Sequence, residues 1–297
     1  MEMAVDSPAL DEAFERMGTL DFELANGFVN HGPMACEALA VMGCDEEIDG
    51  WARWFTEMVG EGAKPVEPLG GDRFDWAAAL GDYRRLPEWM GYFDRVVADD
   101  GWAAAVRQWV PRLMPGLATA LFHGTIRTAH AVRAVGACET EARRAELARA
   151  LAYWAARFHR GPAVTDDGDV AESVMDGARA AVVEAAAAGA RHYVAQPNIF
   201  NLHGVTGAMA VELLIGHLDP EDAAAALTRV RVEHAALYGA DGLATTAASV
   251  PWAPDVVARA ATSADAHQVK LVEACRRGFD VAGDGAFVEA ALRVTRR

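Results

Sequence analysis

The amino-acid sequence predicts an all-α protein, a single large helical domain of about ten or more helices that spans residues 1–297. Long stretches are rich in Ala together with Leu, Arg and Glu, while Ile is scarce, and this composition favours helix over strand. Apolar residues also recur at helical spacing, as in the segment 46–58, where Trp51 and Phe55 share one face. No long repeat and no strong boundary divides the chain, so we expect one domain.

The first helix is expected to begin at Ser7-Pro8, with the serine as N-cap and the proline at the first helical position. The second is expected to start near Asn30 and to stop at Gly43. The segments 63–72 and 161–169 predict loops, and the stretch HYVAQPNIF (192–200) a short strand or an extended link. The remaining helices are expected at 46–58, 86–98, 101–112, 116–136, 139–159, 170–188, 203–217, 221–238, 253–262, 265–278 and 284–294.

The net charge of −16 makes the Coulomb energy of binding a phosphate backbone or an anionic membrane unfavourable, so neither nucleic acid nor a membrane is an expected partner. No uncharged apolar run is long enough to span a membrane, and the N-terminal segment is acidic where a signal peptide would be basic. The cysteines are few, and we expect them to be free in a reducing cytoplasm: Cys36, Cys44, Cys138 and Cys275.

Several familiar catalytic motifs are missing from the sequence. There is no glycine-rich dinucleotide fingerprint after a strand, no Walker loop, no G-x-S-x-G elbow and no H-E-x-x-H. The pair Asp166-Asp167 could belong to a magnesium-binding motif, but two acids in a glycine-containing loop are more typical of a solvated turn.

The histidines are the most informative residues of the sequence. Four of the nine stand beside charged residues at expected helix ends or in loops and are interpreted as surface or capping residues: His159, His192, His217 and His234. The other five lie among small or apolar neighbours in helices that should pack in the core: His31, His123, His130, His203 and His267. Five separate core histidines would each need a hydrogen-bond partner, whereas one metal ion would be a partner shared by several.

A glycine directly follows three of these residues, at Gly32, Gly124 and Gly204. The glycines indicate either close helix packing or room for a bound ligand, and the two interpretations are compatible.

His123 and His130 are seven residues apart, so on one continuous helix they lie about 10 Å apart along the axis and cannot both bind one ion. If His123 is a ligand, His130 is expected to line the pocket or to orient another group. Arg127, one turn beyond His123, stays charged and is interpreted either as a group that holds a carbamate or a substrate oxygen, or as one partner of an ordinary salt bridge.

His267 and Lys270 share a helix face, because they are three residues apart. One interpretation is that Lys270 extends to solvent and has no part in the site. The other is that the lysine is deprotonated and carbamylated by carbon dioxide, which would present a carboxylate-like oxygen to the metal. The sequence leaves both open.

Five segments in order, NHGPMACEAL, HGTIRTAHAVRA, ELARALAYWAA, LHGVTGAMA and AHQVKLVEA, resemble the questin oxidase-like family over roughly residues 28–280. The resemblance implies an oxygenase of secondary metabolism that cleaves the ring of an anthraquinone or anthraquinol, an aromatic polyketide, by a Baeyer–Villiger-like monooxygenase or a dioxygenase reaction. It also implies non-haem Fe(II) held by His31, His123, His203, His267 and carboxylated Lys270, with dioxygen as co-substrate and NADPH as an external reductant.

Two other functions remain open from the sequence. A metal-free helical protein could use the histidines to bind a planar aromatic ligand without turnover. A zinc hydrolase is disfavoured because no carboxylate ligand stands in the motifs. The predicted catalytic residues are His130 and Arg127. The substrate, the oligomeric state and the presence of a separate reductase stay open from the sequence.

Overall fold

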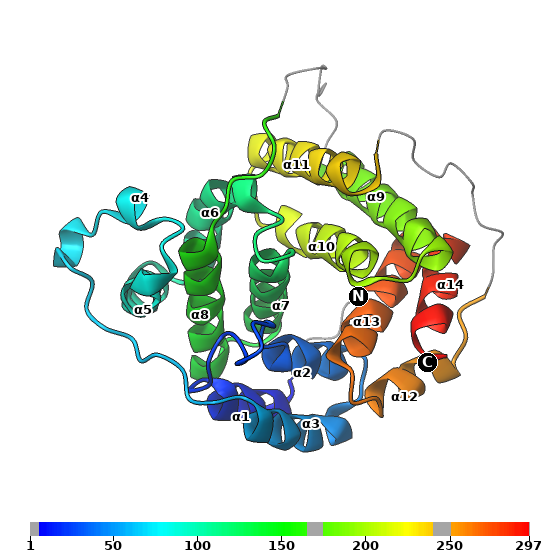
Figure 1. The fold of residues 1–297 in the computed structure, drawn as a ribbon, viewed down its shortest axis with the longest axis horizontal. Coiled ribbons are helices and arrows are strands. Elements are labelled where there is room, and N and C mark those ends of the chain that lie inside the picture. Colours follow the sequence, from blue (N-terminus) through cyan, green and yellow to red (C-terminus); the bar gives the residue numbers. More distant parts are fainter. Residues whose placement is uncertain (1–5, 165–174, 240–250, 297) are drawn as a thin grey trace. The chain divides into compact units, whose positions relative to one another are not determined.

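The computed structural model describes residues 6–164, 175–239 and 251–296. Fourteen α-helices and no β-strand are found in these ranges, which confirms the predicted all-α fold class. The chain divides into two compact units, residues 1–160 and 161–297 (Figure 1). The prediction of one domain over the whole chain stays a prediction.

From residue 6 onward the first unit contains eight helices, and α8 lies at its centre (Figure 1). Helix α8 packs against α5 and α7, and α7 also packs against α2. These contacts bury a core rich in aromatic rings, among them Trp89, Phe93 and Trp109. The helices are α1 (Pro8–Met17), α2 (Gly32–Val41), α3 (Asp45–Met58), α4 (Trp76–Ala79), α5 (Leu86–Asp100), α6 (Trp102–Leu113), α7 (His123–Ala137) and α8 (Glu141–Arg157).

In its described residues the second unit contains six helices arranged around α9, which packs against α10, α11, α13 and α14. Helix α10 also packs against α13, so the two helices that carry His203 and His267 are neighbours. Alanine and valine side chains fill most of this core. The helices are α9 (Met175–Ala195), α10 (Ile199–Ile215), α11 (Pro220–Tyr238), α12 (Asp255–Ala261), α13 (Ala266–Ala282) and α14 (Gly285–Val294).

Several helices begin at a residue whose side chain caps the helix. Ser7 caps α1 by accepting a hydrogen bond from the backbone N–H of Leu10, and Pro8 occupies the first helical position, as predicted. Side-chain oxygens of Thr140, Asn198 and Asp265 cap α8, α10 and α13 in the same way. Helix α3 buries Trp51 and Phe55, which confirms its predicted apolar face.

The helix predicted over 116–136 begins later, at His123. Ala120, Leu121 and Phe122 have φ angles of 48°, 54° and 66°, a left-handed conformation that is strained for residues with a side chain. The three residues turn the chain sharply before α7. The turn places His123 at the first position of the helix instead of in its third turn.

The stretch 192–200 was predicted as a strand or an extended link, and this prediction is wrong for most of it. Residues 192–195 end α9, and Ile199 begins α10. Only residues 196–198 separate the two helices, and the Asn198 side chain starts the second one. The pair Asp166-Asp167 lies outside the described residues.

Candidate metal centre

The first unit brings His31 and His123 into direct contact. His31 is the N-cap residue of α2, and His123 opens α7, which packs against α2. Their Nε2 atoms lie 2.9 Å apart, and the rings meet edge to face with centroids 4.6 Å apart. Both side chains are buried.

Each ring of this pair uses its other nitrogen for a backbone carbonyl. His31 Nδ1 contacts the carbonyl oxygen of Val29, and His123 Nδ1 lies 2.5 Å from that of Ala120. Because a carbonyl only accepts, Nδ1 carries the proton and the lone pair falls on Nε2 in both rings. Two lone pairs that face each other repel, so a cation or a shared proton is required to hold this arrangement.

The second unit pairs His203 of α10 with His267 of α13, with ring centroids 5.3 Å apart. His203 is fully buried and its Nδ1 lies 2.8 Å from the Ile199 carbonyl oxygen. His267 is half-buried, and its Nδ1 lies 3.2 Å from Asp265 Oδ1. These oxygen partners again leave the lone pair on Nε2, as in histidines that bind metals.

Lys270 lies one turn after His267 and is 1% exposed, so the prediction that it could extend to solvent is wrong. Its Nζ atom has no hydrogen-bond partner in the described part of the chain. Burial lowers the pKa of Lys270 to about 7, and the nearby Asp265 only partly opposes this effect. The amine is therefore substantially neutral near physiological pH.

His130 does not join the His31 and His123 pair. Its Nδ1 donates to Glu37 Oε2 at 2.5 Å, and Glu37 also accepts two hydrogen bonds from the Arg133 guanidinium. Burial raises the pKa of Glu37, but the charges and hydrogen bonds of Arg133 and His130 outweigh it and lower the pKa overall. As the spacing predicted, the two histidines of α7 have separate partners.

Arg127 makes a buried salt bridge with Glu146 of α8. Its Nε and Nη2 donate to the two carboxylate oxygens at 2.7 and 2.8 Å. This is the ordinary ion pair that the sequence left open as an alternative to a role with substrate. A catalytic role for Arg127 would require the salt bridge to open.

The glycines after His31, His123 and His203 serve close packing. A Cβ atom at Gly32 would lie 2.5 Å from Met17 Sδ, and one at Gly124 would lie 2.7 Å from the Trp154 ring. At Gly204 it would lie 1.8 Å from Tyr238 Oη. Neighbouring side chains therefore fill the space beside these glycines, which favours the interpretation of close helix packing.

The remaining four histidines differ in burial. His159 is exposed, and His192 and His217 are half-buried, in agreement with a surface position. His234 is buried, which corrects its prediction as a surface residue; its Nε2 donates to the Gly204 carbonyl oxygen at 3.0 Å. Burial lowers the pKa of His234 to about 4, so this ring stays neutral and structural.

Two carboxylates of the candidate site were missed in the sequence. Glu37 is a lone acid in the otherwise apolar helix α2, a pattern that could have indicated a buried ion pair. Asp265 caps α13, and its second contact, with the His267 ring, depends on the local backbone. All four cysteines are free, as predicted.

No family model matches the chain, and no curated protein matches it significantly. No helix in the described ranges is both long and apolar enough to cross a membrane.

Proposed function

We propose that the protein is a metal-dependent oxygenase that cleaves the ring of an anthraquinone or anthraquinol-type aromatic polyketide. One Fe(II) ion is held by His31, His123, His203 and His267, with carboxylated Lys270 as a fifth ligand. The observation that carries the proposal is the shared state of the four rings. Every one has its Nδ1 engaged by an oxygen acceptor, so every Nε2 offers a lone pair.

The donor set fits a first-row transition metal. Neutral imidazoles bind iron, copper and zinc, and the backbone carbonyls behind His31, His123 and His203 fix their orientation. The assignment of iron, of the ring-cleaving reaction and of the aromatic substrate follows the resemblance of the five sequence segments to questin oxidase-like proteins.

Lys270 fits the role of a carbamylated ligand. A buried amine without a hydrogen-bond partner is unfavourable, and an ammonium beside a metal cation would be repelled. In carbamylation the neutral Nζ attacks carbon dioxide, an N–C bond forms and one proton leaves to solvent. The product carries a carboxylate-like oxygen that can bind the metal and cancel part of its charge.

The residues around the centre have separate tasks in this proposal. A redox-active ion held there supplies electron exchange with dioxygen. Glu37 holds the proton of His130 on Nδ1, so His130 Nε2 can accept a proton from a phenol or hydroquinone substrate. The buried setting of His31, His123, His203 and Lys270 keeps competing water away from them.

Metal analysis of protein purified without an affinity tag tests the proposed centre. We expect one iron per chain in the wild type, and less than a tenth of it in His31→Ala or His203→Ala alone. His217→Ala, which changes a half-buried histidine outside the set, is the control and should keep its metal. Two ions per chain, with one lost in each variant, would show that each pair binds its own metal.

Isotopically labelled carbon dioxide tests the modified lysine. The sequence contains only two lysines, Lys64 and Lys270, so assignment of a carbamate signal is simple. In ¹³C NMR with ¹³CO₂ we expect a carbamate resonance in the wild type and in Lys64→Met, and none in Lys270→Met. A signal that persists in Lys270→Met would remove the lysine from the metal site.

Oxygen consumption with an anthraquinol, with and without NADPH, tests the activity. We expect turnover by the iron-loaded wild type, none by Lys270→Ala, and a kcat at least tenfold lower in His130→Ala with its iron retained. Tight binding of the anthraquinol without oxygen uptake would instead identify a metal-free binding protein.

A further inference from the structure

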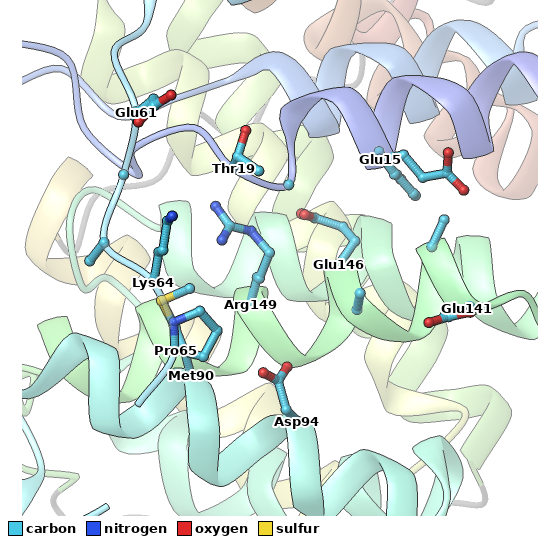
Figure 2. A pocket seen from close by; sticks show the side chains of 16 residues that line it. Glu15, Thr19, Glu61, Lys64, Pro65, Met90, Asp94, Glu141, Glu146 and Arg149 are labelled. Atoms are coloured by element: carbon cyan, nitrogen blue, oxygen red, sulfur yellow. The ribbon is translucent and has the colours of Figure 1, made fainter. Parts of the chain in front are cut away.

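A cavity of about 550 Å³ in the first unit contains none of the proposed metal ligands (Figure 2). It lies between α1, α5, α8 and the segment 61–65. Its volume is in the range of small-molecule sites, and Phe14, Met90 and Pro65 give it apolar walls. The charged groups on these walls decide which molecule it fits.

Arg149 is the buried cation of the cavity. The residue is 7% exposed, and its guanidinium lies over the Phe22 ring, 4.4 Å from the centroid. Nη2 donates to the Leu20 carbonyl oxygen at 2.8 Å, but the buried Nε has no hydrogen-bond partner among the residues that the structure describes. Within the described part of the chain, no carboxylate lies within salt-bridge distance of Arg149.

The neighbouring Arg127 has a carboxylate partner, whereas Arg149 has none in the described part of the chain. Both guanidinium groups lie over the same Phe22 ring, yet Arg127 has both oxygens of Glu146. Glu146 also lines the cavity, but Arg127 already neutralises it. Burial and the charge of Arg127 lower the pKa of Arg149 to about 10, which leaves it a cation at neutral pH. A buried cation in this setting favours an anionic group from a ligand.

The other charges of the lining are distributed unevenly. Figure 2 shows Lys64 beside the Arg149 end of the cavity and Glu15 and Glu141 toward the opposite end. Glu61 and Asp94 add two further acids, so acids outnumber cations even when the Glu146 salt bridge is set aside. A simple anion would be repelled by this excess, whereas a ligand that also carries a positive charge would be attracted.

We propose that this cavity binds a small zwitterion whose carboxylate meets Arg149 and Lys64 and whose ammonium group meets Glu15 and Glu141. The chain between the two charges lies along Phe14, Met90 and Pro65. Arg149 supplies the specific contact, because its planar guanidinium can bind a carboxylate through two N–H groups. The exposed acids contribute attraction at longer range.

Calorimetric titration of the full-length protein tests this site with probes of known charge. The zwitterions are 4-aminobutanoate, 6-aminohexanoate and 8-aminooctanoate, and the single-charge probes are hexanoate and hexylamine. We expect at least one zwitterion to bind ten times more tightly than both single-charge probes. Equal binding of hexanoate would overturn the role of the acids, and equal binding of hexylamine would overturn the role of Arg149.

Substitutions locate the bound probe. Arg149→Met keeps an apolar stem over Phe22. It should lower the affinity for the tightest-binding zwitterion at least tenfold. Because this change could unfold the protein, Lys64→Met and Glu15→Gln, at two exposed residues, provide a second test. Each should lower the affinity for the same zwitterion at least threefold. Arg107→Met removes an exposed charge of α6 outside the cavity and should bind like the wild type. Unchanged affinity in both Lys64→Met and Glu15→Gln would overturn the proposal.

Discussion

At the scale of single residues, the position after a histidine proves to be a packing site. Gly204 follows His203 on α10, and a Cβ atom there would overlap Tyr238 Oη. The ring of Tyr238 also stacks on His192, with the ring centroids 4.1 Å apart. The glycine thus lets α11 approach α10 closely. The same interpretation holds for Gly124 against Trp154.

We predict that Gly204→Ala destabilises the protein by about 1–3 kcal/mol, although alanine is the better helix former. The measurement is urea unfolding. Gly216→Ala, at the end of the same helix with nothing within 4 Å of its Cβ, should change stability by less than about 0.5 kcal/mol. The double variant Gly204→Ala with Tyr238→Phe should recover part of the loss; no recovery would contradict the packing explanation.

The buried Lys270 predicts a stability that depends on pH. Its pKa is about 7 in the folded protein and about 10.4 when unfolded. Between these values the unfolded chain binds a proton that the folded chain does not, so stability rises with pH across this window. Below pH 7 the full cost of burying the ammonium is present.

Lys270→Met should therefore be more stable than the wild type at pH 6 when both are free of metal and carbon dioxide. The expected difference in the free energy of unfolding is on the order of 5 kcal/mol. The advantage should shrink as the pH rises toward 10. Urea unfolding of both proteins at pH 6, 8 and 9.5 measures the difference. A constant gap across this range would show that the amine is not desolvated as described.

At the scale of elements, one carboxylate joins two helices of the first unit. Glu37 of α2 accepts hydrogen bonds from His130 and Arg133, which are one turn apart on α7. Its side chain is 1% exposed and that of Arg133 is 10% exposed, so water cannot replace the lost contacts. This is the same helix pair that carries His31 and His123.

Glu37→Met should lower the free energy of unfolding by about 3–5 kcal/mol, because it removes the carboxylate partner of the buried Arg133 guanidinium. Asp49→Asn on α3 removes an exposed salt bridge with Arg53 and should cost less than about 1 kcal/mol. Thermal and urea unfolding compare the two variants. Similar losses in both would mean that the Glu37 contacts are solvated.

At the scale of the whole molecule, the two units differ in a way that is useful for experiments. Seven of the eight tryptophans lie in residues 1–160, so tryptophan fluorescence reports mainly on the first unit. His203 and His267 lie in the second. A metal shared by all four histidines would connect the stability of the first unit to ligands in the second.

We predict that chelation lowers the melting temperature reported by tryptophan fluorescence in the wild type, since bound metal stabilises the folded state by mass action. In His203→Ala the same chelator should have no effect. A chelator-dependent melting temperature that survives in His203→Ala would show that the first unit binds metal without the second.

The sequence by itself determined the fold class and most helix positions. The Ser7-Pro8 start of α1 and the apolar face of α3 are local signals that need no tertiary contact. It also separated His123 from His130 through helix spacing. These conclusions hold because they depend on residues only a few positions apart.

Only the tertiary structure decided the environment of each candidate. The left-handed residues Ala120 to Phe122 set the start of α7. A buried salt bridge with Glu146 of α8 is the partner of Arg127, which is one of the two interpretations that the sequence left open. Burial of His234 against Gly204 reversed an expectation of exposure, and burial of Lys270 excluded one of its two interpretations. Burial and partners come from segments far apart in the sequence, so no local pattern contains them.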